Sequence, residues 1–420
     1  MVQGLTNAVR AAELRRRIVF TLVMFAIFRL GIFVPTPGVD AARVSQLLSN
    51  GTLFGLLNLF SGGAFFDFSI FAMGIFPYIN ASIIMQLLTV VVPKVEEWSK
   101  EGAEGQKKIS QWTRYGTAVL GFLQALGVTT SLGRSGALYH YSLPSILLIC
   151  LTLTAGTMFL MWLGELITER GIGNGISLII FAGIVAGLPG GIGNLSRYLA
   201  AGTVTVGNLL LLIVIGIVVI AGVIFVIQGE RRVPVQYAKR VVGRRVYGGQ
   251  SSHIPLKVNA AGVIPVIFAI SILYLPITIL SFWHTPFLIT LSHYIGPAGP
   301  INVLLEFVLV VVFTFFYTQV IFKPDDVADN MKKYGGFIPG IRPGRPTAQY
   351  LGKVSNRITV IGAIFLGVVA ILPTFVQNAT SIPGLYFGGT ALLIVVGVAL
   401  DTMKQIQAHL VMRNYQGFLK

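Results

Sequence analysis

Charged side chains are scarce in this sequence. Only 11% of its 420 residues are Asp, Glu, Lys or Arg, whereas 54% are hydrophobic. Soluble globular domains carry roughly 25% charged residues. The composition therefore excludes an ordinary soluble domain and indicates a protein that crosses a membrane many times.

Cysteine and the motifs of common enzymes are also lacking. The single cysteine, Cys150, excludes an intramolecular disulfide, and we expect it to be a small buried apolar residue. There is no GxxxxGK(S/T) nucleotide loop, no HExxH and no GxSxG, and the five histidines are dispersed. These absences argue against an enzyme and against nucleotide-driven transport by this chain. We predict no metal site and no cofactor.

Long apolar runs dominate what is present. Each is roughly 20 residues long, enough to cross a hydrocarbon core of about 30 Å. The ten runs lie at residues 18–34, 72–92, 115–132, 145–164, 176–192, 207–228, 260–280, 302–322, 358–376 and 385–403. They predict an all-α polytopic membrane protein with ten transmembrane helices.

The basic residues fall mainly on one side of these runs. The two ends and alternate connections carry 27 of the 31 lysines and arginines, and the opposite connections carry Arg43, Arg134 and Arg197. Because basic connections stay on the cytoplasmic side of a membrane, both termini are predicted to be cytoplasmic. The net charge of +16 therefore reports topology, and by itself it is weak grounds for a nucleic-acid partner.

The ten runs divide into two sets of five around the Gly-rich connection GLPGGIGN. The resulting halves are residues 1–192 and 193–420, and the second run of each half is interrupted. Pro77 and Asn80 interrupt the first of these runs, and Pro265 lies near the start of the other. Interrupted segments at corresponding positions point to a pathway between inverted repeats. Prolines are also common in ordinary transmembrane helices, so this placement alone leaves both interpretations open.

Two isoleucine pairs occur in the spans that border this pathway. Ile75 with Ile79, and Ile176 with Ile180, are four residues apart and share one helix face. Each pair suits an apolar constriction that gates by dewetting. Such pairs more often face lipid or a protein core, and composition does not choose between these interpretations.

Two cytoplasmic connections are too long to be simple turns. Residues 229–259 alternate apolar and polar side chains through RVPVQYAKRVV, which predicts an extended hairpin with VVGRR at its tip. Residues 323–357 are rich in Gly and Pro and are expected to present Arg342 and Arg345 on an exposed loop. Basic tips suit an anionic cytoplasmic partner, whereas orientation charge alone explains their number but not the loop length.

An ion-coupled secondary transporter of a small solute is the main alternative function. Such carriers place ionisable residues at mid-membrane depth. The candidates here are Arg29, Glu165 and Glu306, and none lies at a clear midpoint with a partner.

Several long motifs, in a fixed order, carry a family resemblance. They are NLFSGGA followed by FPYINASIIMQLLTVV, then RYGTAVLGFLQ, ERGIGNGISLIIFAGIVAGLP, QYAKRVVGRRVYGGQSSHIPLKVNAAGVIPVIFA, GGFIPGIRPGRPT and YFGGTALLIVVGVALD. On these motifs nearly the entire chain resembles the bacterial SecY family, the channel subunits of the Sec protein translocase.

The resemblance implies a fold, a function and a location. Two pseudo-symmetric five-helix halves are expected to close around an hourglass pore, with a re-entrant plug in its outer funnel. The expected function is a protein-conducting channel that translocates unfolded secretory polypeptides across the bacterial cytoplasmic membrane and releases membrane segments laterally into the bilayer. Expected partners are SecE-type and SecG-type small membrane subunits, the SecA motor ATPase, the ribosome, secretory polypeptides with signal sequences, and the lipid bilayer.

The resemblance also implies roles for individual residues. The pore ring is expected at Ile75, Ile79, Ile176, Ile180, Ile267 and Ile394. The plug is expected near residues 60–71, with Phe60, Ser61, Gly62, Gly63, Ala64, Phe65, Phe66 and Asp67. The lateral gate between the second and seventh spans is expected to involve Gln86 and Asn174, and the motor or ribosome is expected to contact Arg244, Arg245 and Arg342.

Overall fold

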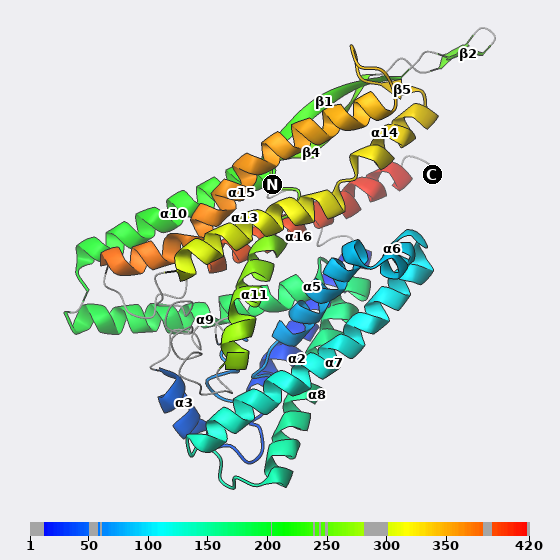
Figure 1. The fold of residues 1–420 in the computed structure, drawn as a ribbon. Coiled ribbons are helices and arrows are strands. Elements are labelled where there is room, and N and C mark those ends of the chain that lie inside the picture. Colours follow the sequence, from blue (N-terminus) through cyan, green and yellow to red (C-terminus); the bar gives the residue numbers. More distant parts are fainter. Residues whose placement is uncertain are drawn as a thin grey trace.

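The computed structural model describes residues 12–49, 58, 61–202, 204–237, 240–242, 245–247, 251–280, 301–380 and 389–417. Its helices form two groups (Figure 1). The first group contains α2 (Ala12–Ile32), α3 (Ala41–Ser49), α5 (Phe76–Val91), α6 (Pro93–Lys100), α7 (Ala103–Arg134), α8 (Leu143–Arg170) and α9 (Gly175–Ala200). The second contains α10 (Val206–Gln228), α11 (Ile264–Leu280), α13 (Asn302–Ile321), α14 (Pro324–Lys333), α15 (Arg345–Thr380) and α16 (Gly389–Gly417). In Figure 1 the groups diverge toward the end that carries α6 and α14, and α11 runs between them.

The ten predicted apolar runs each coincide with a separate helix. In chain order these helices are α2, α5, α7, α8, α9, α10, α11, α13, α15 and α16. By length and composition alone, seven helices of the described part can cross a membrane, or eight if α5 and α6 form one bent span. Helix α2 falls outside that count because charged residues occupy its first turns, and α11 because it is only 17 residues long. The chain is a multi-span membrane protein.

Two helices begin well before their apolar runs. Helix α7 begins at Ala103 and α15 at Arg345, whereas the runs begin at residues 115 and 358. A helix satisfies its own backbone hydrogen bonds in water as well as in lipid, so hydrophobicity marks its membrane portion and not its ends. Pro346 suits the first turn of α15, where its missing N–H has no helical partner. The expectation that Arg345 lies on a loop was therefore wrong, because this exposed residue begins α15.

A sharp bend of 99° separates α5 from α6. Val92 lies at the bend in an extended conformation, with φ −104° and ψ 112°. The proline that follows forces this conformation, because its ring disfavours helical geometry at the preceding residue. The bend directs the charged helix α6 away from the apolar axis of α5.

Five short strands lie at one end of the molecule (Figure 1). They are β1 (Glu230–Tyr237), β2 (Arg240–Val242), β3 (Arg245–Tyr247), β4 (Ser251–Lys257) and β5 (Gly336–Phe337). Strand β1 pairs antiparallel with β4, and β2 pairs antiparallel with β3. The predicted hairpin is therefore confirmed, with Val242 opposite Arg245 beside its tip. Tip residues 243 and 244 lie outside the described residues.

Strand β5 joins the two long basic connections into one platform. It pairs with β1 through Gln236 opposite Phe337. Val235, Leu256 and Ile338 lie in the apolar core beneath this sheet. The hairpin and the loop that carries Arg342 therefore belong to one folded unit.

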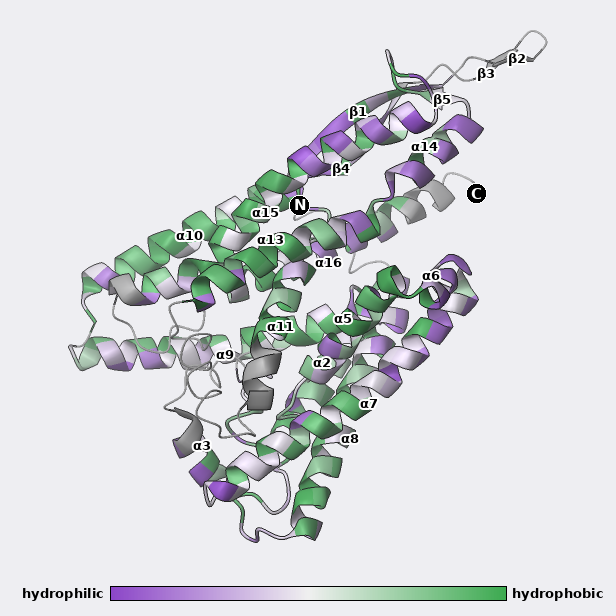
Figure 2. Cartoon of the chain, viewed as in Figure 1, coloured by the Kyte–Doolittle hydropathy of each residue, from purple (hydrophilic) through white to green (hydrophobic). Residues whose placement is uncertain are grey.

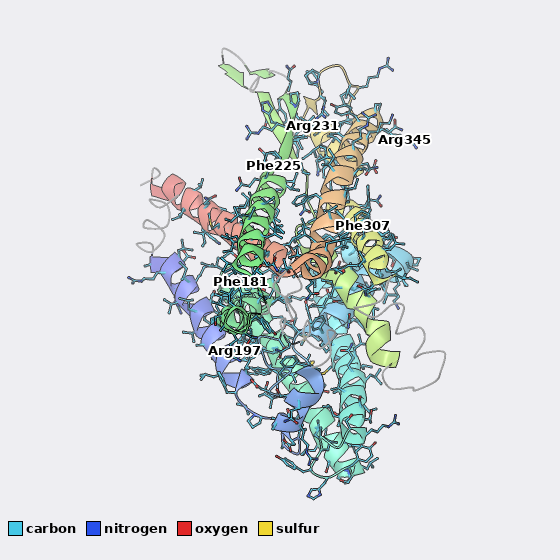
Figure 3. The ribbon with its side chains drawn as sticks, turned by 90° about the vertical axis from the view of Figure 1, so that its left-hand side faces the viewer. Phe181, Arg197, Phe225, Arg231, Phe307 and Arg345 are labelled. Atoms are coloured by element: carbon cyan, nitrogen blue, oxygen red, sulfur yellow. The ribbon has the colours of Figure 1, made fainter. Side chains whose placement is uncertain are left out.

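Polar and apolar surfaces are separated along the long axis. Hydrophilic residues gather on the strands, α14 and α6, whereas hydrophobic residues cover much of α10 and α13 (Figure 2). Arg231 and Arg345 lie at the strand-bearing end, and Phe225 on α10 lies farther from it (Figure 3). Phe225 is 81% exposed in the isolated chain. Exposed apolar side chains on long helices are the surface that lipid covers.

Candidate functional site

Four isoleucines from three separate helical regions line one small cavity. They are Ile75, which directly precedes α5, Ile79 on α5, Ile180 on α9 and Ile267 on α11. Each is at most 7% exposed. The structure thus brings together residues that are nearly 200 positions apart in sequence. We call these four residues the waist cluster.

The other two expected ring residues belong to the same apolar core. Ile394 of α16 is fully buried, and Ile176 of α9 is partly buried against that core. Neither lines the cavity. Phe76 and Ile270 complete the lining. Sequence reasoning missed both, although Ile270 follows Ile267 by three residues and therefore shares its helix face.

The cavity is too small for a file of water. Its volume of about 10 Å³ is close to the minimum that admits one water molecule. Its lining side chains offer no hydrogen-bond partner, and a buried water needs two to four. The waist cluster is thus a dry apolar contact between α5, α9 and α11.

Backbone turns place Ile75 at the N-terminal end of α5. Gly74 has φ +55°, a conformation that glycine adopts without steric cost, and it precedes Ile75 directly. The N–H group of Ile79 then donates 3.1 Å to the carbonyl oxygen of Ile75, which sets these two side chains on one face. Pro77 fits the first turn of α5 because no helical acceptor is available there.

Before α5, residues 61–75 form a series of turns buried in the helix bundle. Phe65 and Phe68 are almost fully buried, whereas Asp67 is exposed. The Asn58 side-chain oxygen accepts a 2.9 Å hydrogen bond from the N–H of Phe66. Phe60 lies outside the described residues. We call residues 61–67 the turn segment.

A backbone strap fixes the chain just after the turn segment. The N–H of Thr36 donates 3.1 Å to the carbonyl oxygen of Phe68, and the N–H of Ile70 donates 3.0 Å to that of Val34. Gly156 of α8 allows Ile70 to approach closely, because a Cβ atom at Gly156 would overlap the Ile70 carbonyl oxygen. Residues 68–70 are therefore held by backbone contacts on two sides.

Aromatic stacking continues this anchorage to α2 and α8. The Phe71 ring lies between those of Phe28 and Phe159, with centroid separations of 6.3 and 5.8 Å. Gly31 makes room for it, since a Cβ atom there would overlap the Phe71 ring. The chain beyond residue 67 is thus fixed, and the turn segment lies before it.

The two residues expected at the lateral gate make local contacts. Gln86 donates from Nε2 to the Ser82 hydroxyl 3.4 Å away on the same helix, and its buried Oε1 has no partner. Asn174 is the N-cap of α9, and its Oδ1 accepts a 3.1 Å hydrogen bond from the N–H of Ser177. Within the described residues, no hydrogen bond connects Gln86 to Asn174. A capping role explains Asn174 at α9, and the gate assignment remains a prediction.

Two residues considered for ion coupling have other partners. Arg114 of α7 and Glu165 of α8 form a two-bond ion pair, with Nη2 2.8 Å from Oε2 and Nε 3.0 Å from Oε1. Arg29 of α2 donates 2.8 Å to the carbonyl oxygen of Gly62. Glu165 therefore links α8 to α7, and Arg29 contacts the turn segment.

Charges from both helix groups approach one another beyond the bend after α5. Lys100 of α6 lies 2.6 Å from Glu96, and this hydrogen bond lowers the pKa of the Glu96 carboxyl. Lys323, just before α14 in the other group, lowers that pKa further through its charge. Asp326 of α14 in turn raises the pKa of Lys100. The polar ends of the two groups are therefore close enough to interact electrostatically.

The basic tips are only partly described. Arg342 is exposed, and its carbonyl oxygen accepts a 2.9 Å hydrogen bond from the Thr347 hydroxyl, which shapes the loop before α15. Arg245 lies on β3, and Arg244 lies outside the described residues. The guanidinium of Arg342 is free to meet a partner in solution.

Known proteins share this arrangement. A profile of the SecY family matches residues 69–403. The protein translocase subunit SecY of Halalkalibacterium halodurans is 49% identical over 431 aligned residues, which cover 100% of each chain. The protein translocase subunit SecY of Escherichia coli is 49% identical over 420 aligned residues, which cover 97% of this chain and 94% of the relative.

A solved structure shares the fold over nearly the same length. It concerns the plug domain of a SecY protein, which stabilises the closed state of the translocation channel and maintains a membrane seal. The TM-score is 0.63 at 19% sequence identity, covering 94% of this chain and 92% of that one. The family profile and the full-length relatives lead to one conclusion: the chain belongs to the SecY family.

Proposed function

We propose that this chain is a protein-conducting channel of the bacterial cytoplasmic membrane, with both termini cytoplasmic, and that it has no catalytic activity of its own. Full-length similarity to protein translocase subunits supports this function. The observation that carries it is the dry waist formed by Ile75, Ile79, Ile180 and Ile267. Interrupted segments at corresponding positions of two halves, meeting at a dry apolar contact, are typical of a pathway through a membrane protein.

The waist suits an extended polypeptide of any sequence. Isoleucine side chains attract no ion and form no directional bond, so they can part around a chain without selecting its side chains. When no chain is present they close, and the remaining space of about 10 Å³ holds too little water to conduct ions. Ile176 and Ile394 belong to the same ring in this proposal, as the next residues to contact a passing chain.

The turn segment acts as the plug. Its Gly62 and Gly63 have φ of +69° and +99°, so the backbone turns where an ordinary side chain is strained. Exposed Asp67 suits a wet outer funnel, whereas buried Phe65 packs inward. Displacement of residues 61–67 opens the path, and the strap at residues 68–70 keeps the segment attached.

The lateral gate lies between α5 and α11. Both helices line the waist, so their separation opens the pore toward lipid. Gln86 on α5 and Ser271 on α11 each bury an oxygen without a partner. An unpaired buried polar atom costs about 1–3 kcal/mol, so the closed gate is only weakly favoured and an apolar signal sequence can compete.

Energy and membrane partners come from outside this chain. The platform presents Arg342 to the SecA motor ATPase or the ribosome, and Arg244 and Arg245 of the neighbouring basic connection contribute to the same contact. Such basic tips attract phosphate or carboxylate groups. Small SecE-type and SecG-type subunits cover part of the exposed apolar surface. The ion pair with Arg114 leaves the Glu165 carboxylate committed to helix packing, which removes Glu165, but not Glu306 of α13, from the ion-coupled alternative.

Reconstitution tests this function. The chain, with SecE-type and SecG-type subunits, is placed in liposomes with SecA, ATP and a secretory polypeptide that has a signal sequence. We expect the polypeptide to become protected from external protease, and the same polypeptide without its signal sequence to remain digestible. Saturable ion-coupled uptake of a small solute, with no protected polypeptide, would support the transporter instead.

A further inference from the structure

Arg29 is a charged residue at the end of an apolar helix, and its partner lies in the turn segment. Its Nη1 donates 2.8 Å to the carbonyl oxygen of Gly62. Its guanidinium also lies over the ring of Phe33, 5.3 Å from the centroid. None of the ion pairs among the described residues includes Arg29. The charge is therefore satisfied by a peptide carbonyl, in a bond stronger than one between neutral groups.

The two ends of the plug are held by different kinds of contact. The strap at residues 68–70 consists of backbone hydrogen bonds to Val34 and Thr36. The front end, at Gly62, is held to α2 by the side chain of Arg29. Breaking that side-chain bond loosens the front end, which is then seated only by its packing and by bonds to Asn58, while the strap stays intact.

We propose that Arg29 is a latch that positions the plug in its closed place by binding the Gly62 carbonyl oxygen. This inference rests on the proposed function of residues 61–67 as the plug. Opening breaks the Arg29 bond and swings the front end about the strap. Closing returns the carbonyl to the guanidinium, which the Phe33 ring keeps in place.

The position of Arg29 allows it to release the plug without leaving its guanidinium charge buried and unsolvated. It lies three residues before the end of α2 at Ile32, which is about 4.5 Å along the helix axis. A long arginine side chain can reach the polar boundary of the membrane from that depth. The guanidinium is therefore hydrated when the carbonyl leaves, so the latch can reopen and reclose.

The chain provides a matched control. Arg43 also donates from Nη1 to a glycine carbonyl oxygen, that of Gly136, at 2.8 Å. That bond joins α3 to the connection after α7 and does not involve the turn segment. Both Arg43→Gln and Arg29→Gln thus remove an arginine bond to a glycine carbonyl. Arg43→Gln also removes an ion pair with Asp40, and only Arg29→Gln affects the plug.

Two measurements on the reconstituted complex test the latch. The first is ion conductance across a planar bilayer with no translocating polypeptide. The second is the rate at which Ala64→Cys reacts with a membrane-impermeant maleimide added from the outer side, in a Cys150→Ala background. Ala64 is fully buried and small, so cysteine there reports whether the plug leaves its place.

We expect Arg29→Gln to raise both the resting conductance and the labelling rate about tenfold, because one hydrogen bond to a charged donor is lost. Arg29→Lys keeps a charge and a donor, so both values should lie between those of the wild type and Arg29→Gln. Arg43→Gln should leave both at the wild-type value. Wild-type conductance and labelling in Arg29→Gln, or an equal rise in Arg43→Gln, would overturn the proposal.

If Arg29→Gln does not assemble, Arg29→Lys decides alone, and wild-type values in it reject the latch. Signal-dependent translocation by the wild-type complex is measured in parallel. If the wild-type complex does not translocate, the proposed channel function is refuted. The latch is tested separately, by the conductance and labelling measurements. If conductance and labelling reject the latch but the wild-type complex translocates, the proposed channel function is unaffected.

Discussion

Gly62 lies directly against Gly183 of α9. A Cβ atom on Gly62 would be 3.0 Å from the Gly183 Cα atom and 3.3 Å from Cδ1 of Ile32. Backbone atoms cannot move aside as a flexible side chain can. The first turn of the proposed plug is therefore seated by contacts that only glycine permits.

Gly62→Ala should unseat the plug and raise resting ion conductance. Gly63→Ala is the matched control, because Gly63 also has positive φ but a Cβ atom there would meet nothing within 4 Å. A non-glycine residue in this conformation costs about 1–2 kcal/mol at either position. Larger conductance in Gly62→Ala than in Gly63→Ala isolates the contact with α9, and equal conductance would contradict it.

The seal should depend on the waist isoleucines. Replacing Ile79 and Ile267 together by glycine should raise resting conductance, because the widened space admits water. Ile217 and Ile361 are 62% and 65% exposed on the apolar surface, and their double glycine variant is the control. Each glycine costs a helix about 1 kcal/mol in both variants. Single-channel recording of the two variants decides, and a leak of equal size in both would reject the seal.

The Glu165 carboxylate should matter for stability and not for transport. Glu165→Gln weakens a partly exposed ion pair with Arg114, so the free energy of unfolding should fall by about 0.5 kcal/mol. Signal-dependent translocation should continue at the wild-type rate. Thermal unfolding and the protease-protection assay measure these two quantities. Abolished transport at unchanged stability would indicate ion coupling instead.

Reversing the charge of Arg342 should slow motor-driven export. Arg342→Glu replaces an exposed guanidinium on the platform with a carboxylate, and the rate should fall about tenfold as association with the motor weakens. Lys353→Glu changes an exposed cation on α15 in the same way and should have little effect. Export rates at low and high salt give the comparison. Equal export by wild type and Arg342→Glu would remove this residue from the contact.

Much of the fold was predictable because hydrophobicity and charge act locally along the chain. Ten apolar runs gave ten helices, and alternating side chains gave the β1 to β4 hairpin. Helix ends were harder: Arg345 lies on a helix whose polar first turns resemble a loop in composition. Hydrophobicity reports the membrane portion of a helix, whereas its ends depend on backbone hydrogen bonds.

The candidate site also has parts that the sequence predicted and parts that it could not predict. Spacing placed Ile75 with Ile79 on one face, but their meeting with Ile180 and Ile267 depends on tertiary packing that no local pattern encodes. Arg29 stood out in the sequence as a charge in an apolar run, yet its partner is a backbone carbonyl 33 positions away. A carbonyl partner leaves no trace in side-chain identity, so the role of Arg29 required the structure.

Site-specific crosslinking of a stalled secretory polypeptide shows directly whether the polypeptide passes through the waist. Cysteines are placed singly at Ile79 and Ile267 in a Cys150→Ala background, with a lipid-facing control at Ile361. We expect disulfide adducts between the stalled polypeptide and both waist cysteines, and none at the control. A polypeptide that has crossed the membrane without forming an adduct at either waist position would contradict it.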